Sequence, residues 1–260
     1  MSAPTGSLYL IPNTLDFGTA AEANPIDDVL PASVIRTAAR LTHWVAENAK
    51  TTRAFLKRVD AVVPLAQPLQ SLAIVELPRP PKGAHSTPVA DLGALLAPAR
   101  EGHDIGLISE AGLPAVADPG AALVQAAHAT GIAVVALAGP SSLVLALAAS
   151  GLNGQSFAFV GYLPVEASAR AARIRELEAL SRRAAQTQLM IETPYRNDAL
   201  LGALIAHLQP GTRLSVSCGL TLANGFTRTD DVRGWKARPM SLPSDVPVVF
   251  SLLAATIQPS

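Results

Sequence analysis

The sequence predicts an α/β fold made of two α/β domains, and three observations support this prediction. Short apolar runs alternate with helix-like segments, a pattern typical of a mostly parallel sheet covered by helices. The 260 residues, 49% of them hydrophobic, can bury two cores of ordinary size. A turn-rich junction, Gly151-Leu152-Asn153-Gly154, interrupts the alternation. We therefore expect an N-terminal domain at 1–153 and a C-terminal domain at 154–260.

The expected N-terminal elements follow from hydrophobic periodicity. The apolar runs predict strands at 8–11, 43–46, 105–108 and 132–137. Helical spacing predicts helices at 32–40, 51–59, 119–129 and 140–149. The stretch 64–88 is rich in proline and has little periodicity, so we expect a long loop there.

The C-terminal part repeats the alternation and then becomes richer in strands. Strands are expected at 157–162, 188–192, 213–218, 226–229 and 246–253, with helices at 168–185 and 197–208. The late strands resemble hairpins, which differs from the crossover pattern of the first domain.

Charge and cysteine content exclude several classes of protein. The net charge is zero, but residues 1–153 carry 9 basic and 12 acidic side chains, whereas residues 154–260 carry 11 and 8. The second part is therefore the better partner for a polyanion. Cys218 is the only cysteine, so an intramolecular disulfide and a Cys-rich zinc site are excluded. The first residues lack the charged and apolar regions of a signal peptide, and no membrane span is expected, so a cytoplasmic location is the simplest interpretation.

Familiar nucleotide and metal motifs do not occur. The chain contains no G-x-G-x-x-G, no P-loop sequence and no G-x-S-x-G elbow. Its five histidines are scattered without the spacing of metal ligands, so we expect no metal site.

What remains is a set of loops at the ends of predicted strands: 11–14, 109–120, 139–142 and 192–196. Loops at the carboxyl ends of parallel strands are where open α/β sheets bind ligands, and glycines there allow a close approach of backbone. Each loop alone has a simple explanation as a turn or helix cap. Together they favour a small-molecule site.

The same loops carry a family resemblance over most of the chain. The matching segments are LYLIP near the start, SEAGLPAVADPG at 109–120, AGPSS at 138–142, SGLNGQSFAFVGYLP at 150–164 and ETPYR at 192–196. In this order they resemble the tetrapyrrole methylase superfamily of S-adenosylmethionine (SAM)-dependent methyltransferases, within the branch of the ribosomal RNA small subunit methyltransferase I proteins. The resemblance implies two α/β domains with SAM in the cleft between them, and a homodimer.

The resemblance also implies which residues contact SAM. They are Pro12, Ala111, Gly112, Leu113, Val116, Ser141, Ser142, Glu192, Thr193 and Leu220. Leu113 replaces an acidic residue of the superfamily, so its contact would be made by the backbone. Two segments depart from the branch, 77–83 and 219–222, and both bear on the methyl acceptor rather than on the cofactor.

Methyl transfer to a hydroxyl needs alignment and benefits from a general base. Glu110, Asp118 and Glu192 are the carboxylates at the expected strand ends, and the sequence does not choose among them. Tyr195 and Arg196 are candidates for orienting the acceptor. Glu192 has an alternative interpretation as a structural carboxylate paired with Arg196.

RNA is the expected partner of the C-terminal domain. The predicted helix at 168–185 carries five arginines, Arg170, Arg173, Arg175, Arg182 and Arg183, which could meet an RNA backbone. The alternative is a solvated face on which Glu178 pairs with Arg182. Three functions stay open: methylation of RNA, most simply at a ribose 2′-hydroxyl of small-subunit ribosomal RNA, methylation of a tetrapyrrole or other small molecule, and a non-catalytic SAM-binding module.

Overall fold

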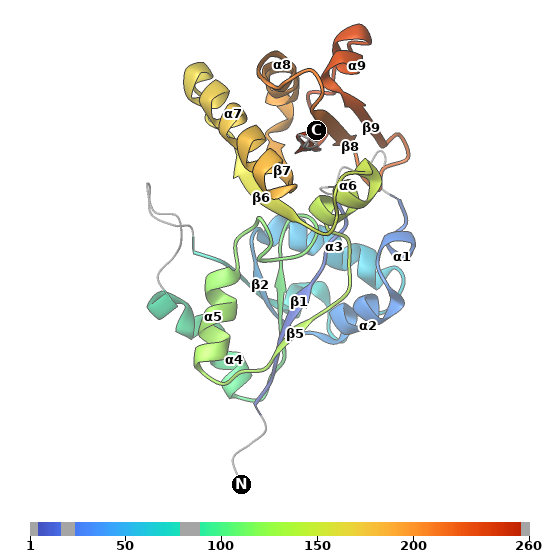
Figure 1. The fold of residues 1–260 in the computed structure, drawn as a ribbon. Coiled ribbons are helices and arrows are strands. Elements are labelled where there is room, and N and C mark those ends of the chain that lie inside the picture. The colour runs from blue at the N-terminus through green and yellow to red at the C-terminus, as the bar shows by residue number, and fades with distance from the viewer. Residues whose placement is uncertain (1–4, 17–23, 79–88, 256–260) are drawn as a thin grey trace. The chain divides into compact units, whose positions relative to one another are not determined.

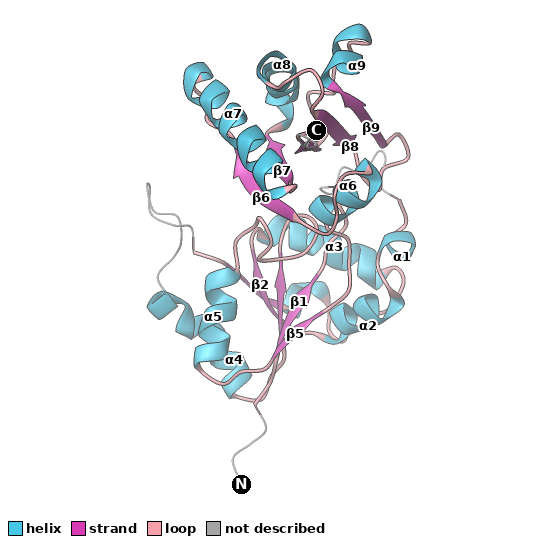
Figure 2. Ribbon diagram, in the orientation of Figure 1, coloured by secondary structure: helices cyan, strands magenta, loops and turns pink. Residues whose placement is uncertain are grey.

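A computed structural model describes residues 5–16, 24–78 and 89–255. The chain forms two compact units, Met1–Ser141 and Ser142–Ser260 (Figures 1 and 2). The expectation of two α/β domains is confirmed, but the division differs from the predicted boundary after residue 153. Helix α6 (Ser142–Ser150) packs against strands of the second sheet, so it belongs with the second unit although it precedes the turn-rich junction.

The first unit is built on a parallel five-stranded sheet of order β3-β2-β4-β1-β5. Its strands are β1 (Leu8–Ile11), β2 (His43–Ala46), β3 (Ala73–Glu76), β4 (Ile105–Ile108) and β5 (Val134–Ala136). β4 lies between β1 and β2, with residue 105 opposite residues 8 and 43. All four residues of β4 are buried, as expected of a central parallel strand.

Helices cover the sheet of the first unit on both faces. They are α1 (Ile26–Val29), α2 (Ala32–Arg40), α3 (Ala49–Asp60), α4 (Ala97–Arg100) and α5 (Ala121–Ala129), with the short 3₁₀ helices η1 (Leu69–Ser71) and η2 (Val89–Leu96). Phe55 of α3 packs with Trp44 and Ile108 on one face. Leu123 of α5 packs with Leu107 on the other. Asn48 caps the start of α3, because its side chain accepts hydrogen bonds from the Lys50 and Thr51 N–H groups.

The expected long loop at 64–88 is wrong in part, because η1 and β3 lie within it. β3 is an edge strand with little burial, paired only with β2 in the described structure, so its sequence shows no apolar alternation. Residues 79–88 of the expected loop lie outside the described residues.

The second unit has a mixed sheet of order β6-β7-β10-β8-β9. The strands are β6 (Phe157–Tyr162), β7 (Thr187–Glu192), β8 (Arg213–Cys218), β9 (Phe226–Asp231) and β10 (Val248–Leu253). Only β6 and β7 pair in parallel, while β10, β8 and β9 pair antiparallel, which confirms the expected hairpin-like character. The helices beyond α6 are α7 (Ala167–Ala184), the 3₁₀ turn η3 (Pro194–Arg196), α8 (Asn197–His207) and α9 (Val232–Ala237).

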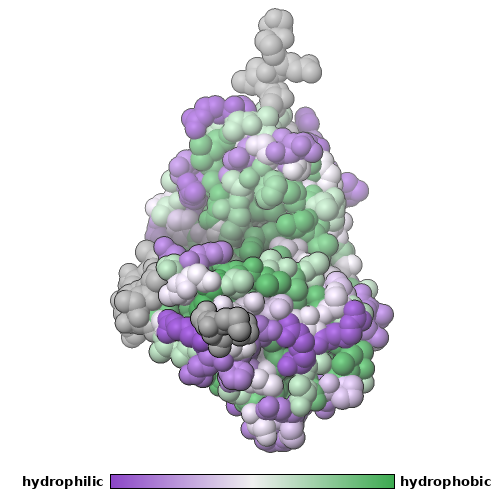
Figure 3. Space-filling model, turned by 90° about the horizontal axis from the view of Figure 1, so that it is seen from below, coloured by the Kyte–Doolittle hydropathy of each residue, from purple (hydrophilic) through white to green (hydrophobic). Residues whose placement is uncertain are grey.

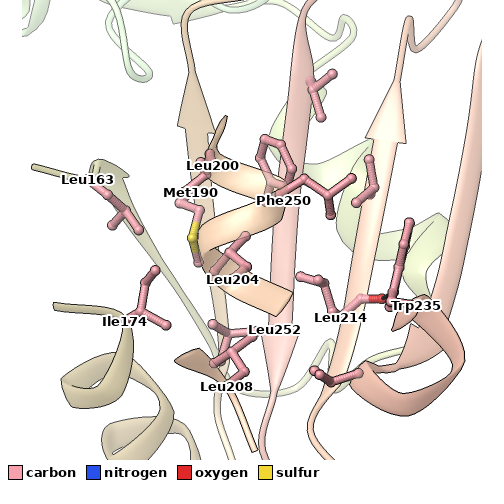
Figure 4. Packing of buried hydrophobic residues seen from close by; sticks show 14 of the residues in the cluster. Leu163, Ile174, Met190, Leu200, Leu204, Leu208, Leu214, Trp235, Phe250 and Leu252 are labelled. Atoms are coloured by element: carbon pink, nitrogen blue, oxygen red, sulfur yellow. Dashed lines mark hydrogen bonds between the residues drawn. The ribbon is translucent and has the colours of Figure 1, made fainter. Parts of the chain in front are cut away.

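The main core of the second unit lies between its sheet and helices α7, α8 and α9 (Figure 4). Phe250 and Leu214 come from neighbouring strands, and Leu204 comes from α8. Trp235 of α9 is fully buried, and its Nε1–H donates a hydrogen bond of 2.8 Å to Leu214 O, which satisfies the one polar atom of the indole.

The surface is mixed in character. Figure 3 shows apolar residues gathered in contiguous areas of one face, with hydrophilic residues around them. None of the helices in the described part of the chain combines the length and the apolar character that a membrane span needs.

Candidate cofactor site

The connections of the first sheet reverse direction between β1 and β4. From β1 the chain crosses to β2, on the β4 side, whereas from β4 it crosses to β5, on the far side of β1. Ligands of open parallel sheets bind at such a switch point, outside the carboxyl ends of the strands. Two of the predicted loops, 11–14 and 109–120, begin there.

Asn13 ties these two loops together. Its backbone N–H donates to Gly112 O at 2.9 Å, and the two residues form an isolated antiparallel bridge. Its side-chain Nδ2 donates to Ser109 O at 3.1 Å and to Glu110 O at 2.9 Å. Asn13 is buried, so these bonds form away from competing water. The sequence reasoning placed Asn13 in a loop of interest but assigned it no role.

An ion pair between a buried carboxylate and a partly exposed guanidinium anchors the first loop to α3. Arg58 Nη1 lies 3.0 Å from Asp16 Oδ2 and donates to Thr14 Oγ1 at 3.0 Å. The Thr14 hydroxyl in turn donates to Asp16 Oδ1 at 2.8 Å. Because each oxygen has a defined partner, the chain just after β1 is held in one conformation.

The loop after β5 joins the same place through Gly139. A Cβ on Gly139 would lie 2.2 Å from Pro12 Cβ and 2.4 Å from Pro12 Cγ. Only glycine therefore allows the two loops to touch. A Cβ on Gly112, in the loop after β4, would lie 3.4 Å from Pro140 O in the loop after β5. Three of the predicted loops are thus in contact within the first unit.

The loop after β4 holds unusual backbone conformations. Gly112 and Gly120 have φ of 66° and 129°, and Ala115 and Ala117 have φ of 66° and 64°. A left-handed conformation costs a non-glycine residue roughly 1–2 kcal/mol. Such residues cluster at ligand sites, where the surrounding structure holds them. Asn13 holds the first part of this loop through Ser109 O, Glu110 O and Gly112 O, and the side chain of Val116, farther along, is left 46% exposed.

Ser109, the first residue after β4, is 3% exposed, and its Oγ has no hydrogen-bond partner among the described residues. A buried hydroxyl without a partner is costly, which points to a ligand or water that completes it. The hydroxyl lies at the start of the loop that Asn13 holds.

Three carboxylates gather beside this loop. Glu47 Oε2 accepts the Glu110 backbone N–H at 3.0 Å. Burial raises the pKa of Glu47 above its usual range. Burial, together with the nearby charges of Glu47 and Glu110, raises the pKa of Asp118 to about 7. Glu47 directly follows β2, so the strand-end rule that singled out Glu110 could have found it.

In the second unit, Glu192 is buried at the end of β7 and both of its oxygens are engaged. Oε2 lies 2.6 Å from Arg196 Nη2, and Oε1 accepts the Thr193 N–H at 2.8 Å. The paired alternative for Glu192 is therefore what the structure shows. Tyr195, between these residues in sequence, is 73% exposed and free of this pair.

The remaining predicted cofactor residues are divided between the units. Ala111, Leu113 and Val116 lie on the loop after β4. Ser141 ends the first unit, and Ser142 begins α6. Leu220 is half-buried against a small apolar cluster that contains Leu147, Leu189 and Val249. No group of three or more side chains among the described residues could hold a metal ion.

Comparison with known proteins identifies the family. Residues 32–230 match the model of the tetrapyrrole (corrin/porphyrin) methylases. The chain belongs to this family. The match covers both units and confirms the resemblance drawn from the strand-end loops.

Curated relatives and solved structures agree with this assignment. The chain is 37% identical over 139 residues to the ribosomal RNA small subunit methyltransferase I of Mesorhizobium japonicum, covering 54% of this chain and 46% of that protein. It is 46% identical over 76 residues to the protein of that name from Xylella fastidiosa, covering 29% and 28%. The matched part spans less than half the length of these relatives.

The solved structures show the fold. The methyltransferase CobJ is 15% identical, with a TM-score of 0.56 and coverage of 98% of this chain and 97% of that one. A uroporphyrin III C-methyltransferase from Thermus thermophilus is also 15% identical, with a TM-score of 0.53 and coverage of 95% and 97%. At 15% identity, the structural similarity shows only that the fold is shared.

Proposed function

We propose that the chain is a SAM-dependent methyltransferase that acts on RNA, at a ribose 2′-hydroxyl of small-subunit ribosomal RNA. The observation that carries the proposal is the meeting of three strand-end loops at the β1/β4 switch point, through Asn13, Gly112 and Gly139. Membership of the methylase family and the name of the curated relatives support the reaction and the acceptor.

The residues at this place fit SAM. The buried Ser109 hydroxyl lacks a partner, and the contact loops carry glycine where a side chain would intrude. The carboxylates Glu47, Glu110 and Asp118 favour a cationic ligand. SAM supplies a methyl group on a positively charged sulfur. Ala111, Leu113, Val116 and Ser141 would hold it in the first unit, and Ser142, Thr193 and Leu220 would do so in the second.

Asp118 is the carboxylate best suited to take the proton of a hydroxyl acceptor. A pKa of about 7 leaves it both partly ionised and basic near neutral pH. The nearby negative charge of Glu110 helps to raise the pKa of Asp118. Glu192 is engaged with Arg196 and Thr193, so we assign it a positioning role for the loop that carries Tyr195.

RNA would meet the second unit. Residues 142–260 hold 11 basic and 8 acidic side chains. The expected alternative for α7, a Glu178–Arg182 pair, is wrong: Glu178 is buried and accepts the Gln209 N–H and the Thr212 hydroxyl. Arg173 pairs with Glu176 at 2.7 Å instead, on an exposed face where such a pair contributes little and yields readily to phosphate.

The other partners follow from the family and the acceptor. We propose a homodimer, as the family resemblance implies. We also propose a cytoplasmic site of action, because the relatives named above are ribosomal RNA methyltransferases.

Incubation of the purified chain with radiolabelled SAM, in an extract of its own cells lacking the gene, tests the proposal. We expect label in small-subunit ribosomal RNA, and we expect it to disappear with Gly112→Trp. Gly112 has φ of 66° and a Cβ there already meets Leu15 at 3.2 Å, so the indole displaces the loop. Gly202→Trp is the matched control, because a Cβ on Gly202 meets nothing within 4 Å.

The other outcomes separate the alternatives. Label in a porphyrin-like or other small-molecule fraction would replace the RNA acceptor with a small molecule. Absence of label, with SAM still bound in calorimetry, would support a non-catalytic module. Absence of binding as well would overturn the methyltransferase assignment.

A further inference from the structure

Helix α3 concentrates the positive charge of the first unit. It carries four of the nine basic side chains of residues 1–153 but only one of the 12 acidic ones. Arg58 is engaged with the chain after β1. The other three side chains are exposed and form no ion pair within the described part of the chain. They are Lys50, Arg53 and Lys57, which we call the α3 ridge.

The three cations lie on one face of the helix. They are placed at i, i+3 and i+7, which puts them on the same side of an α-helix. The opposite side is buried and carries Phe55, Leu56 and Val59. Lys50 and Lys57 are about 10 Å apart along the helix axis, long enough to meet more than one phosphate of a nucleic-acid strand.

The helix itself gains no stability from this arrangement. Lys50 and Arg53 are three residues apart, Arg53 and Lys57 are four apart, and like charges at these spacings destabilise a helix. The helix dipole also disfavours a cation in the first turn, such as Lys50, and this turn contains no acidic residue. A solvated helical face usually alternates charges of both signs. The pattern therefore indicates a surface that meets an anion.

The carboxylates at the two ends of α3 are held by backbone groups. Glu76 Oε1, at the end of β3, accepts the Ala49 N–H at 2.7 Å. Asp60 Oδ1, in the last residue of α3, accepts the Leu65 N–H at 3.0 Å. Neither carboxylate forms an ion pair with the ridge. The ridge cations are thus available to an anion from outside the described chain.

The ridge begins beside the candidate cofactor site. α3 follows β2 with only Glu47 and Asn48 between them (Figure 1). Glu47 Oε2 accepts the Glu110 N–H, which fixes the start of α3 to the loop that carries Asp118. Lys50 lies three residues beyond Glu47, in the first turn of the helix. The ridge therefore starts at the carboxyl edge of the first sheet, where the cofactor loops meet.

We propose that the α3 ridge binds the phosphate backbone of the RNA acceptor. The inference rests on the proposed function and deepens it, because it adds a phosphate-binding surface in the first unit to the contacts proposed for the second. A row of cations without acids between them suits a repeating negative charge, and a nucleic-acid strand carries one at each phosphate. Such contacts position the strand and do not identify its bases.

Fluorescence anisotropy of the full chain with a labelled single-stranded RNA of roughly 12 nucleotides, measured at several salt concentrations, tests this inference. Arg53→Gln/Lys57→Gln is expected to raise the Kd about tenfold at roughly 0.15 M salt. The plot of log association constant against log salt should become less steep by about 1.4, because each phosphate contact with a single strand contributes about 0.7. Glutamine removes the charge and keeps a similar helix propensity.

Arg100→Gln/Lys236→Gln is the matched control. It removes one arginine and one lysine from exposed positions of α4 and α9. Neither the Kd nor the salt dependence is expected to change in this control. Calorimetry is expected to give the same SAM affinity for Arg53→Gln/Lys57→Gln as for the unaltered chain, because neither side chain is among the proposed cofactor contacts.

The outcomes separate the ridge from the proposed function. An unchanged salt dependence in Arg53→Gln/Lys57→Gln would overturn the ridge, and the labelling assay would still read the proposed function independently. An equal effect in the control would also overturn the ridge, because net charge alone would then explain it. Failure of the unaltered chain to bind the RNA would do the same. RNA that binds through the ridge but receives no label in the labelling assay would overturn the proposed function and leave the ridge as an RNA-binding surface.

Discussion

Replacing Gly139 with valine is expected to abolish SAM binding and to lower the stability of the first unit by about 2–3 kcal/mol. The Cβ alone would lie 2.2 Å from Pro12 Cβ, a separation that packed atoms do not adopt. Pro12 is buried and cannot swing aside, so the loops after β1 and β5 must separate. Calorimetry with SAM and chemical denaturation measure the two effects.

Two glycines provide the controls for this variant. A Cβ on Gly154 or Gly202 would meet no heavy atom within 4 Å, so alanine or valine there is expected to leave SAM affinity unchanged. Gly139→Ala is expected to show the same defects as Gly139→Val in weaker form. Normal SAM affinity in Gly139→Val would mean that the contact between these loops has no part in holding the cofactor.

Asp118→Asn is expected to make methyl transfer about 10²–10⁴-fold slower, the usual contribution of a general base. In the unaltered chain the rate is expected to rise as the pH increases through about 7, where Asp118 ionises. That rise should be absent in the variant. Asp28→Asn, at an exposed position of α1, is the control and is expected to keep both rate and profile. An unchanged pH profile in Asp118→Asn would remove Asp118 from the role.

Asp118→Asn is expected to slow methyl transfer but to raise the stability of the folded chain above neutral pH. The pKa of Asp118 is raised from 3.8 to about 7 in the folded chain, so the folded state holds the proton more tightly than the unfolded state. The stabilisation that comes from this tighter proton binding is therefore lost progressively as the pH rises from 3.8 to about 7. At about pH 8 the asparagine variant should be more stable than the parent by roughly 1–2 kcal/mol, after allowance for partial solvent access. Below about pH 4 the two should be equal.

The strands that build the candidate site were predictable because their amino-acid composition reflects their burial. The bounds of β1, β2 and β4 coincide with the apolar runs, since strands buried on both faces contain continuous hydrophobic residues. β3 was missed for the opposite reason. It lies at the edge and three of its positions are exposed or nearly so, and prolines surround it.

The site was predictable only where one local rule applied. The strand-end rule singled out Glu110 and Asp118 and could also have found Glu47, and the family resemblance added Pro12, whereas the contribution of Asn13 depends on which strands are neighbours. Those neighbours are set by long-range pairing, so the bonds from Asn13 to residues nearly a hundred positions away have no local signal. The boundary between the units also depends on long-range packing. The chain divides after residue 141 rather than at the turn at 151–154, because α6 packs against the second sheet.

Identification of the methylated nucleoside tests the central claim most directly. Small-subunit ribosomal RNA from cells lacking the gene would be treated with the purified chain and SAM, digested to nucleosides and analysed by mass spectrometry. The expected product is one nucleoside with a methyl group on its ribose, formed by the unaltered chain and not by Gly112→Trp. A methyl group on a base, or RNA that remains unmethylated while SAM binds, would contradict a ribose 2′-hydroxyl methyltransferase with Asp118 as its base.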